Sequence, residues 1–230
     1  MSGRSPRWFT GIKYPYEANF ADNTWAQIIA ACQRGTVPET WAVGNNKTMM
    51  INGASYQIDI IGKNHDTYTA GGTAPLTFQM HECYHEKKPM NLAATNKGGW
   101  TSCDMRIKHL PGILSKMPTE VQNSIREVNK LTSAGNYSTT IVTTADKLFL
   151  LSEIEIFGIV DRSVNGEGTL YDYYKAAGSR IKTFNGTATI WRERSPSADY
   201  DYMFCTVYST GTSSQADANY DRGVAFAFCF

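Results

Sequence analysis

The chain has 230 residues, of which 42% are hydrophobic and 19% are charged, and its net charge is +1. This balance allows a buried core and excludes an intrinsically disordered protein. A net charge near zero, with no run of Lys or Arg longer than Lys87-Lys88, gives no electrostatic basis for binding nucleic acid.

Residues 1–22 mix aromatic residues with Gly11 and Pro15 and show no regular period. They predict an N-terminal arm or leading strand before a single domain over residues 23–230. This arm lacks the apolar stretch of a signal peptide, and no later run approaches the roughly 18 apolar residues that a spanning helix needs. We therefore expect neither a secretion signal nor a membrane segment in this chain.

The first predicted helix begins after Asn23-Thr24. Apolar residues at 25, 28, 29 and 32 share one helical face, and Gly35 is a stop signal. Two strands then flank the turn Asn52-Gly53, which is a hairpin signal. A third strand is predicted over residues 76–80.

The middle of the chain predicts short helices and strands. Pro118, followed by Val121 and Ile125, favours a helix. Strands are expected over 128–131 and 147–151, and a short helix within 168–175. Three strand-like runs, over 187–191, 203–208 and 224–230, close the chain. The order predicts an α+β fold of mixed or antiparallel sheets and short helices, with the N- and C-termini paired in one sheet.

Two clusters have the residue types of a catalytic or metal site. His81, Cys83 and His85 would share one face of a strand, but a fourth ligand is missing, so we favour a polar strand face over a metal site. Glu153 and Glu155 alternate with apolar residues on a predicted strand and are interpreted as structural acids rather than an acid–base pair.

The remaining sequence carries no recognised catalytic motif. Its five cysteines form an odd set without a C-x-x-C pair, which predicts buried thiols. We therefore predict a protein that is not an enzyme, with no catalytic residue, no metal and no cofactor.

The C-terminal segment has a restricted alphabet. From Ser197 to Asp221 the residues are Ser, Ala, Asp, Tyr, Thr, Gly and Asn, apart from Met203, Phe204, Cys205, Val207 and Gln215. Tyrosines with small polar residues are typical of antibody binding loops, whereas an ordinary polar loop does not account for so many tyrosines. Randomising the adenines of Asn codons yields the same alphabet.

This pattern predicts a binding surface near the C-terminus. The predicted ligand contacts are Trp191, Arg192, Arg194, Asp199, Tyr200, Asp201, Tyr202, Tyr208, Ser213, Ser214, Asp217, Asn219, Tyr220 and Asp221.

Sequence blocks spread over nearly the whole chain resemble a domain of gut bacteria and their phages. That group is similar to the C-type lectin-like variable proteins of diversity-generating retroelements. The resemblance implies a C-type lectin-like fold whose variable region, here residues 190–222, binds a ligand or receptor. The triplets that bind sugar and Ca²⁺ in animal lectins are absent. The blocks include Thr24-Trp-Ala-Gln-Ile, Trp41-Ala-Val-Gly44, Ile61-Gly-Lys-Asn-His-Asp66, Thr95-Asn-Lys-Gly-Gly-Trp100, Leu148-Phe-Leu-Leu-Ser-Glu153, Glu155-Ile-Phe-Gly158 and Gly223-Val-Ala-Phe-Ala-Phe-Cys-Phe230.

The resemblance sets the main expectation for function. It implies a display protein at the surface of a virion or bacterial cell, attached through a partner, that binds a protein or glycan ligand on a cell surface. One alternative is a structural virion or surface-protein domain. Another is a relative of the formylglycine-generating oxidases, in which Cys205 and Cys229 would be a cysteine pair on neighbouring strands.

Overall fold

The computed structural model describes residues 16–176 and 178–230, and shows an α+β protein with several small antiparallel sheets and short helices. The largest sheet has the order β1-β2-β3-β11, formed by Asn46–Ile51, Ala54–Lys63, Leu76–Met80 and Ala227–Cys229. The second sheet has the order β10-β9-β8, formed by Ser213–Asp217, Met203–Val207 and Trp191–Pro196. Two separate hairpins contain the remaining strands. One pairs β4 (Val128–Ser133) with β5 (Ile141–Asp146), and the other pairs β6 (Lys182–Phe184) with β7 (Thr187–Thr189).

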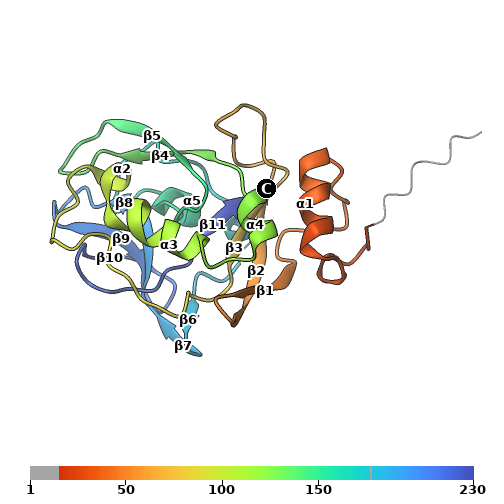
Figure 1. Cartoon of the computed structure of the whole chain (residues 1–230). Helices are drawn as coiled ribbons and strands as arrows, with labels where there is room; N and C mark the ends of the chain where they lie inside the picture. Colours follow the sequence, from red (N-terminus) through yellow and green to blue (C-terminus); the bar gives the residue numbers. More distant parts are fainter. Residues whose placement is uncertain (1–15, 177) are drawn as a thin grey trace, which may run out of the picture.

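Most helices are short, and they surround the sheets. Figure 1 shows α1 at one end of the molecule, the sheet of β8, β9 and β10 at the other, and β11 between them. A π-helical turn, η2, leads directly into α3. The helices are η1 (Phe20–Asp22), α1 (Trp25–Arg34), α2 (Gly99–Ser102), η2 (Met105–His109), α3 (Leu110–Leu114), α4 (Thr119–Ser124), α5 (Glu153–Phe157) and α6 (Asp172–Lys175).

Helix α1 confirms the first predicted element. The Thr24 hydroxyl accepts the backbone N–H of Gln27, whose side chain accepts the N–H of Thr24 in return, so two free N–H groups of the first turn are satisfied. Gly35 ends the helix at φ 64°, a left-handed conformation that glycine adopts without steric cost. The predicted apolar face is buried.

The Asn52-Gly53 hairpin is also confirmed. Asn52 and Gly53 have φ of 51° and 77°, and β1 pairs with β2 on either side of them. The predictions of β3, of helix α4 after Pro118 and of the strand from Val128 are confirmed as well. Local turn and capping signals therefore placed these elements correctly.

The core of the largest sheet is aromatic. Phe78 on β3 stacks on Phe228 of β11 at a ring-centroid distance of 5.4 Å, and it contacts Trp25 of α1 edge-on at 6.1 Å. Phe230 lies 5.4 Å from Phe78 and 6.1 Å from Trp25. The last residues of the chain thus complete the core that α1 and β3 begin.

Three predicted strands differ in the structure. Residues 147–151 form no strand and make only an isolated bridge from Phe149 to Ala227. Glu153 and Glu155 lie on helix α5, because Ser152 and Glu155 form a capping box that starts a helix there. The run 187–191 is divided between β7 and β8, since a second Asn-Gly turn, Asn185-Gly186, closes the hairpin of β6 and β7.

The C-terminal strand β11 joins the largest sheet through β3. Residues 16–22, the described part of the predicted N-terminal arm, contain η1 rather than a strand. The rest of that arm, residues 1–15, lies outside the described residues.

A buried ionic network links strands β4 and β8 with helix α5 and the loop that follows β2. Arg194 on β8 donates to both carboxylate oxygens of Glu155 on α5. Lys130 on β4 lies 2.8 Å from Glu155 and 2.8 Å from Asp66, and Tyr171 also donates to Asp66. Pairing of this kind offsets the cost of removing the charges from water. The neighbouring cations lower the pKa of Asp66 to about 2, despite its burial.

Candidate functional site

The predicted binding segment forms the β9–β10 hairpin and the loops at its two ends. Strand β10 is an edge strand, paired only with β9 among the described strands, in the register Ser213 with Val207 to Asp217 with Met203. The loop 208–212 closes one end. The loop 197–202 and residues 218–221 lie at the other end, about 13 Å away at the rise of an extended strand.

Three tyrosines of this segment have exposed rings. Tyr200, Tyr208 and Tyr220 are 41%, 44% and 50% exposed, and Tyr202 is half-buried with its ring 5.6 Å from that of Tyr200. No residue in the described part of the chain hydrogen-bonds to the hydroxyls of these four tyrosines. The hydroxyls are therefore free to contact a ligand, and the exposed parts of the rings are accessible to it.

The buried side chain of Asn96 holds the loop 197–202 by its backbone. Its amide nitrogen donates to the carbonyl oxygens of Ser197, Tyr200 and Met203 at 3.2, 2.8 and 2.9 Å. Its backbone N–H donates to the carbonyl of Asp201 at 2.6 Å. None of these contacts uses a side chain of Asp199, Tyr200, Asp201 or Tyr202, so the anchoring bonds do not depend on those side chains.

Arg192 holds the residues around the end of β10 in the same way. Its guanidinium donates to the carbonyl oxygens of Ala216 at 3.2 Å and Asp217 at 2.7 Å, and also to that of Tyr220. The backbone N–H of Met90 donates to the carbonyl of Ala218 at 2.8 Å. The exposed side chains of Asn219, Tyr220 and Asp221 again take no part in the anchoring contacts.

The structure divides the predicted contacts into three groups. At one end of the hairpin, the loop 197–202 and residues 217–221 gather the exposed or half-buried Asp199, Tyr200, Asp201, Tyr202, Asp217, Asn219, Tyr220 and Asp221. Tyr208 and Ser213 lie at the opposite end, with Ser214 following on the edge strand. A third group, Trp191, Arg192 and Arg194, is buried and bonded to the protein interior, so we remove these three from the proposed surface.

Glu193, between the two buried arginines, is a buried acid that sequence reasoning did not single out. Neither of its carboxylate oxygens has a hydrogen-bond partner within the described residues. Burial, together with the nearby carboxylates of Glu153 and Glu167, holds the pKa of Glu193 well above its usual range. The folded protein thus favours a neutral Glu193.

Replacing Glu193 with glutamine is expected to stabilise the protein at alkaline pH. The unfolded carboxyl ionises near pH 4.3, whereas the folded one keeps its proton to higher pH. The neutral carboxyl of Glu193 therefore makes its full contribution to the free energy of unfolding below the unfolded pKa. This contribution is lost as the pH rises toward the folded pKa. At pH 8 we expect E193Q to be more stable than the wild type, and at pH 4 to lose that advantage.

The measurement is urea unfolding of both proteins from pH 4 to pH 8. The exposed Glu39→Gln, for which no such gain is expected, is the matched control. An E193Q protein that is no more stable than the wild type at pH 8 would contradict the neutral state of this acid.

The histidine–cysteine cluster does not converge on a shared ion. His81 pairs with Asp59 at 2.8 Å, and His85 shares a 2.6 Å hydrogen bond with Tyr56. Among the described residues no group of three or more His, Cys, Asp or Glu is placed to hold a metal. Burial raises the pKa of the Cys83 thiol to about 12, which disfavours the reactive thiolate.

The cysteine pair of the oxidase alternative is separated in the structure. Cys205 lies on β9 and Cys229 on β11, and these strands belong to different sheets. The expectation of neighbouring strands was therefore wrong. All five thiols are buried, and burial raises the pKa of both Cys205 and Cys229 well above the usual value.

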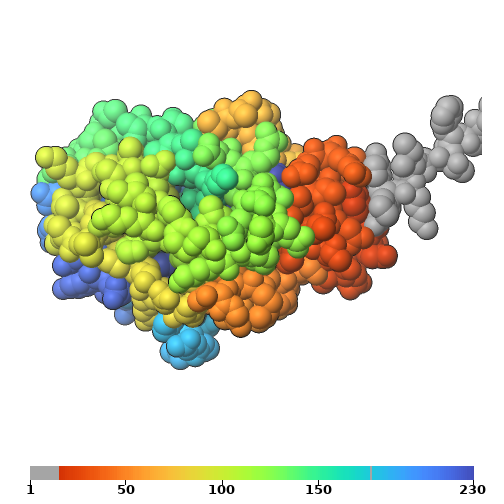
Figure 2. Space-filling model, in the orientation of Figure 1, coloured from red at the N-terminus to blue at the C-terminus, as the bar shows by residue number. Residues whose placement is uncertain are grey.

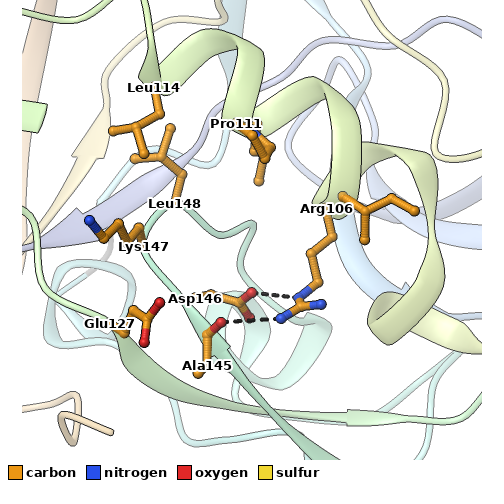
Figure 3. Close-up of a pocket in the computed structure, with 10 residues that line it drawn as sticks. Arg106, Pro111, Leu114, Glu127, Ala145, Asp146, Lys147 and Leu148 are labelled. Atoms are coloured by element: carbon orange, nitrogen blue, oxygen red, sulfur yellow. Dashed lines mark hydrogen bonds and ion pairs between the residues drawn. The ribbon is translucent and has the colours of Figure 1, made fainter. Parts of the chain in front are cut away.

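A hollow of about 380 Å³ opens beside the π-helical turn, as Figure 3 shows. Arg106 points across it to Asp146, at 2.5 Å, and to the carbonyl of Ala145, at 3.1 Å. Asp146 also accepts the indole N–H of Trp100. The guanidinium and the carboxylate are both engaged within the protein, so Arg106 and Asp146 are not a free catalytic pair. The rest of the lining combines the charged Glu127 and Lys147 with aliphatic side chains, which are Ile107, Leu110, Pro111, Leu114 and Leu148.

These features define an α+β protein with a tyrosine-rich hairpin surface held from within by buried polar residues. Residues 72–230 match the family described as a domain of unknown function, DUF6273, and the chain belongs to that family. No curated protein and no solved structure matches the chain. None of the described helices is long and apolar enough to cross a membrane.

Proposed function

We propose that this chain is a ligand-binding display protein with a C-type lectin-like scaffold, not an enzyme, and that a diversity-generating retroelement varies its C-terminal surface. It acts at the surface of a virion or bacterial cell, attached through a partner, and binds a protein or glycan ligand on a cell surface. The proposal rests on the sequence resemblance and on the way in which the hairpin loops are held.

One observation carries the proposal. Asn96 and Arg192 hold the loops through backbone carbonyls, while the side chains at positions 199–202 and 219–221 are exposed or half-buried and take no part in these contacts. Substitutions at those positions therefore leave the anchoring bonds in place. A surface that changes its side chains without losing its fold needs this arrangement, and tyrosines with small polar residues suit binding to many partners.

The retroelement part of the proposal is tested in the DNA that flanks the gene. We expect a near-copy of the codons for residues 190–230 beside a reverse transcriptase gene. The two copies should differ almost only at adenines of the template, at codons for the exposed residues. Absence of such a copy would contradict diversification.

The binding part is tested with Tyr200, Tyr202 and Tyr220 replaced together by alanine. Because exposed aromatic residues provide most of the energy of such contacts, we expect at least a tenfold loss in binding of the labelled full chain to intact bacterial cells. The melting temperature should remain nearly unchanged, since the loop anchors are backbone groups.

The exposed Met50, on β1 of the other sheet, offers the control. Met50→Ala should leave cell binding intact. Wild-type chain that binds none of a panel of Gram-negative and Gram-positive cells would contradict the proposal and favour the structural virion or surface-protein alternative. A large fall in the melting temperature of the triple variant would instead place the three rings in the core.

A further inference from the structure

Leu92 and Tyr137 lie beside the tyrosine-bearing end of the hairpin, although both are outside the C-terminal segment. Leu92 is 75% exposed, and the preceding residue, Asn91, donates its backbone N–H to the carbonyl of Ala218 at 3.1 Å. Tyr137 is 58% exposed and follows Asn136, whose backbone N–H donates to the side-chain oxygen of Asn96 at 2.7 Å.

Asn96 lies on the same loop as Leu92 and anchors two further loops. It accepts the N–H of Asn136, next to Tyr137, and its amide donates to the carbonyl oxygen of Tyr200 at 2.8 Å. Figure 2 shows yellow atoms next to blue C-terminal atoms at the left edge of the molecule. Exposed apolar side chains from all three loops therefore surround one buried residue.

The backbone of Tyr137 is strained. Its φ is 63°, and the other described non-glycine residues with positive φ are all asparagines, which tolerate this conformation. A tyrosine adopts it only at an energetic cost, and within the described residues no hydrogen bond to the hydroxyl offsets that cost. The exposed ring of Tyr137 therefore contributes little to the stability of the fold. Contact with a partner explains a tyrosine at this position better than folding does.

The same end of the hairpin has an excess of negative charge. Four aspartates, none in an ion pair with a described residue, lie near three cations, Lys97, Arg192 and Arg222, whereas the whole chain is slightly positive. Arg222 already lies over the ring of Tyr220 at 5.4 Å. Tyrosine rings among carboxylates attract cationic groups by both charge and cation–π interaction. The aspartates are Asp199, Asp201, Asp217 and Asp221.

We infer that Leu92 and Tyr137 complete the binding surface, and that this surface takes a protein partner presenting lysine or arginine side chains. The inference rests on the proposed function and adds two contacts outside the variable region, together with the charge of the partner. The fixed apolar residues supply a constant contact area, while the tyrosines and aspartates supply selectivity.

The experiment uses the full chain and two fluorescent twelve-residue probes, one alternating Lys and Gly and one alternating Glu and Gly. Fluorescence anisotropy at 20 mM and 150 mM salt measures their dissociation constants. We expect the lysine probe to bind at least tenfold more tightly than the glutamate probe at low salt. Replacing Asp199, Asp201 and Asp217 with asparagine should remove this difference, whereas the exposed Asp172→Asn elsewhere should not.

Tyr137→Gly and Leu92→Ser test the added contacts. Each should weaken the lysine probe about fivefold or more, and Tyr137→Gly should keep or raise the melting temperature because glycine accepts the left-handed backbone. Equal binding of the two probes would overturn the cationic partner, and unchanged affinity in both variants would overturn the added contacts. The proposed function is judged separately. It still stands if the cationic partner or the added contacts fail, provided that the wild-type chain binds bacterial cells and the triple tyrosine variant does not.

Discussion

Replacing Arg194 with methionine is expected to lower the free energy of unfolding by about 3–5 kcal/mol, because it leaves a buried carboxylate without its main partner. Glu155 would keep Lys130, which is shared with Asp66, and the backbone N–H of Ser152. The carbonyl oxygens of Leu131, Leu150 and Glu167 would also lose the guanidinium that they accept from. Chemical denaturation followed by tryptophan fluorescence measures the loss.

The exposed Arg34→Met, in the last turn of α1, is the matched control and should change stability by no more than about 0.5 kcal/mol. The double variant of Arg194→Met with Glu155→Gln should be less unstable than the sum of the two single variants, since it no longer buries the unpaired charge. Strict additivity would show that the pair acts as two independent residues.

Replacing Asn96 with alanine is expected to lower the free energy of unfolding by about 3 kcal/mol and to loosen two loops at once. The change leaves three carbonyl oxygens and the backbone N–H of Asn136 without their side-chain partner. Hydrogen exchange should then accelerate in residues 134–138 and 197–203, while β1 to β3 keep their protection. Cell binding should fall together with this protection.

The exposed Asn165→Ala provides the comparison, because it removes the same amide from the surface. It should change neither exchange nor cell binding. Unchanged hydrogen exchange of residues 197–203 in Asn96→Ala would show that the loop holds its conformation without the buried amide. The structure would then no longer support a fixed framework beneath variable side chains.

Much of the secondary structure could be predicted because its signals are local. The capping box of α1 and the turn at Asn52-Gly53 each act within four residues, so the sequence displays them directly. The same kinds of signal were present at Ser152 to Glu155 and at Asn185-Gly186. Greater weight on these short motifs would have found α5 and the hairpin of β6 and β7.

Other features depend on distant partners and leave no local signal. Strand β10 has the sequence Ser-Ser-Gln-Ala-Asp, without the β-branched or aromatic residues that favour strands, and it forms by pairing with β9. Arg192 and Arg194 resemble surface residues in the sequence, yet their partners lie 24 or more residues away. Hydrophobicity alone therefore could not place them inside.

The candidate site was predicted in composition but not in shape. The restricted alphabet from Ser197 to Asp221 identified a segment whose tyrosines are exposed or half-buried. It could not show that the hairpin separates Tyr208 from Tyr200 and Tyr220, because that separation follows from the register of β9 and β10. Nor could it show the role of Asn96, which lies 101 residues before Ser197.

The pairing of β3 with β11 also governs when the protein can fold. Residues near 78 and 228 must meet across about 150 positions of chain, so the largest sheet closes late and with a high loop-closure cost. During synthesis, one edge of β3 stays unpaired until residues Ala227 to Cys229 of β11 have left the ribosome. All five residues of β3 are buried in the folded protein. A chain truncated before β11 would therefore expose an unpaired, aggregation-prone strand and would be a target for chaperones and proteases.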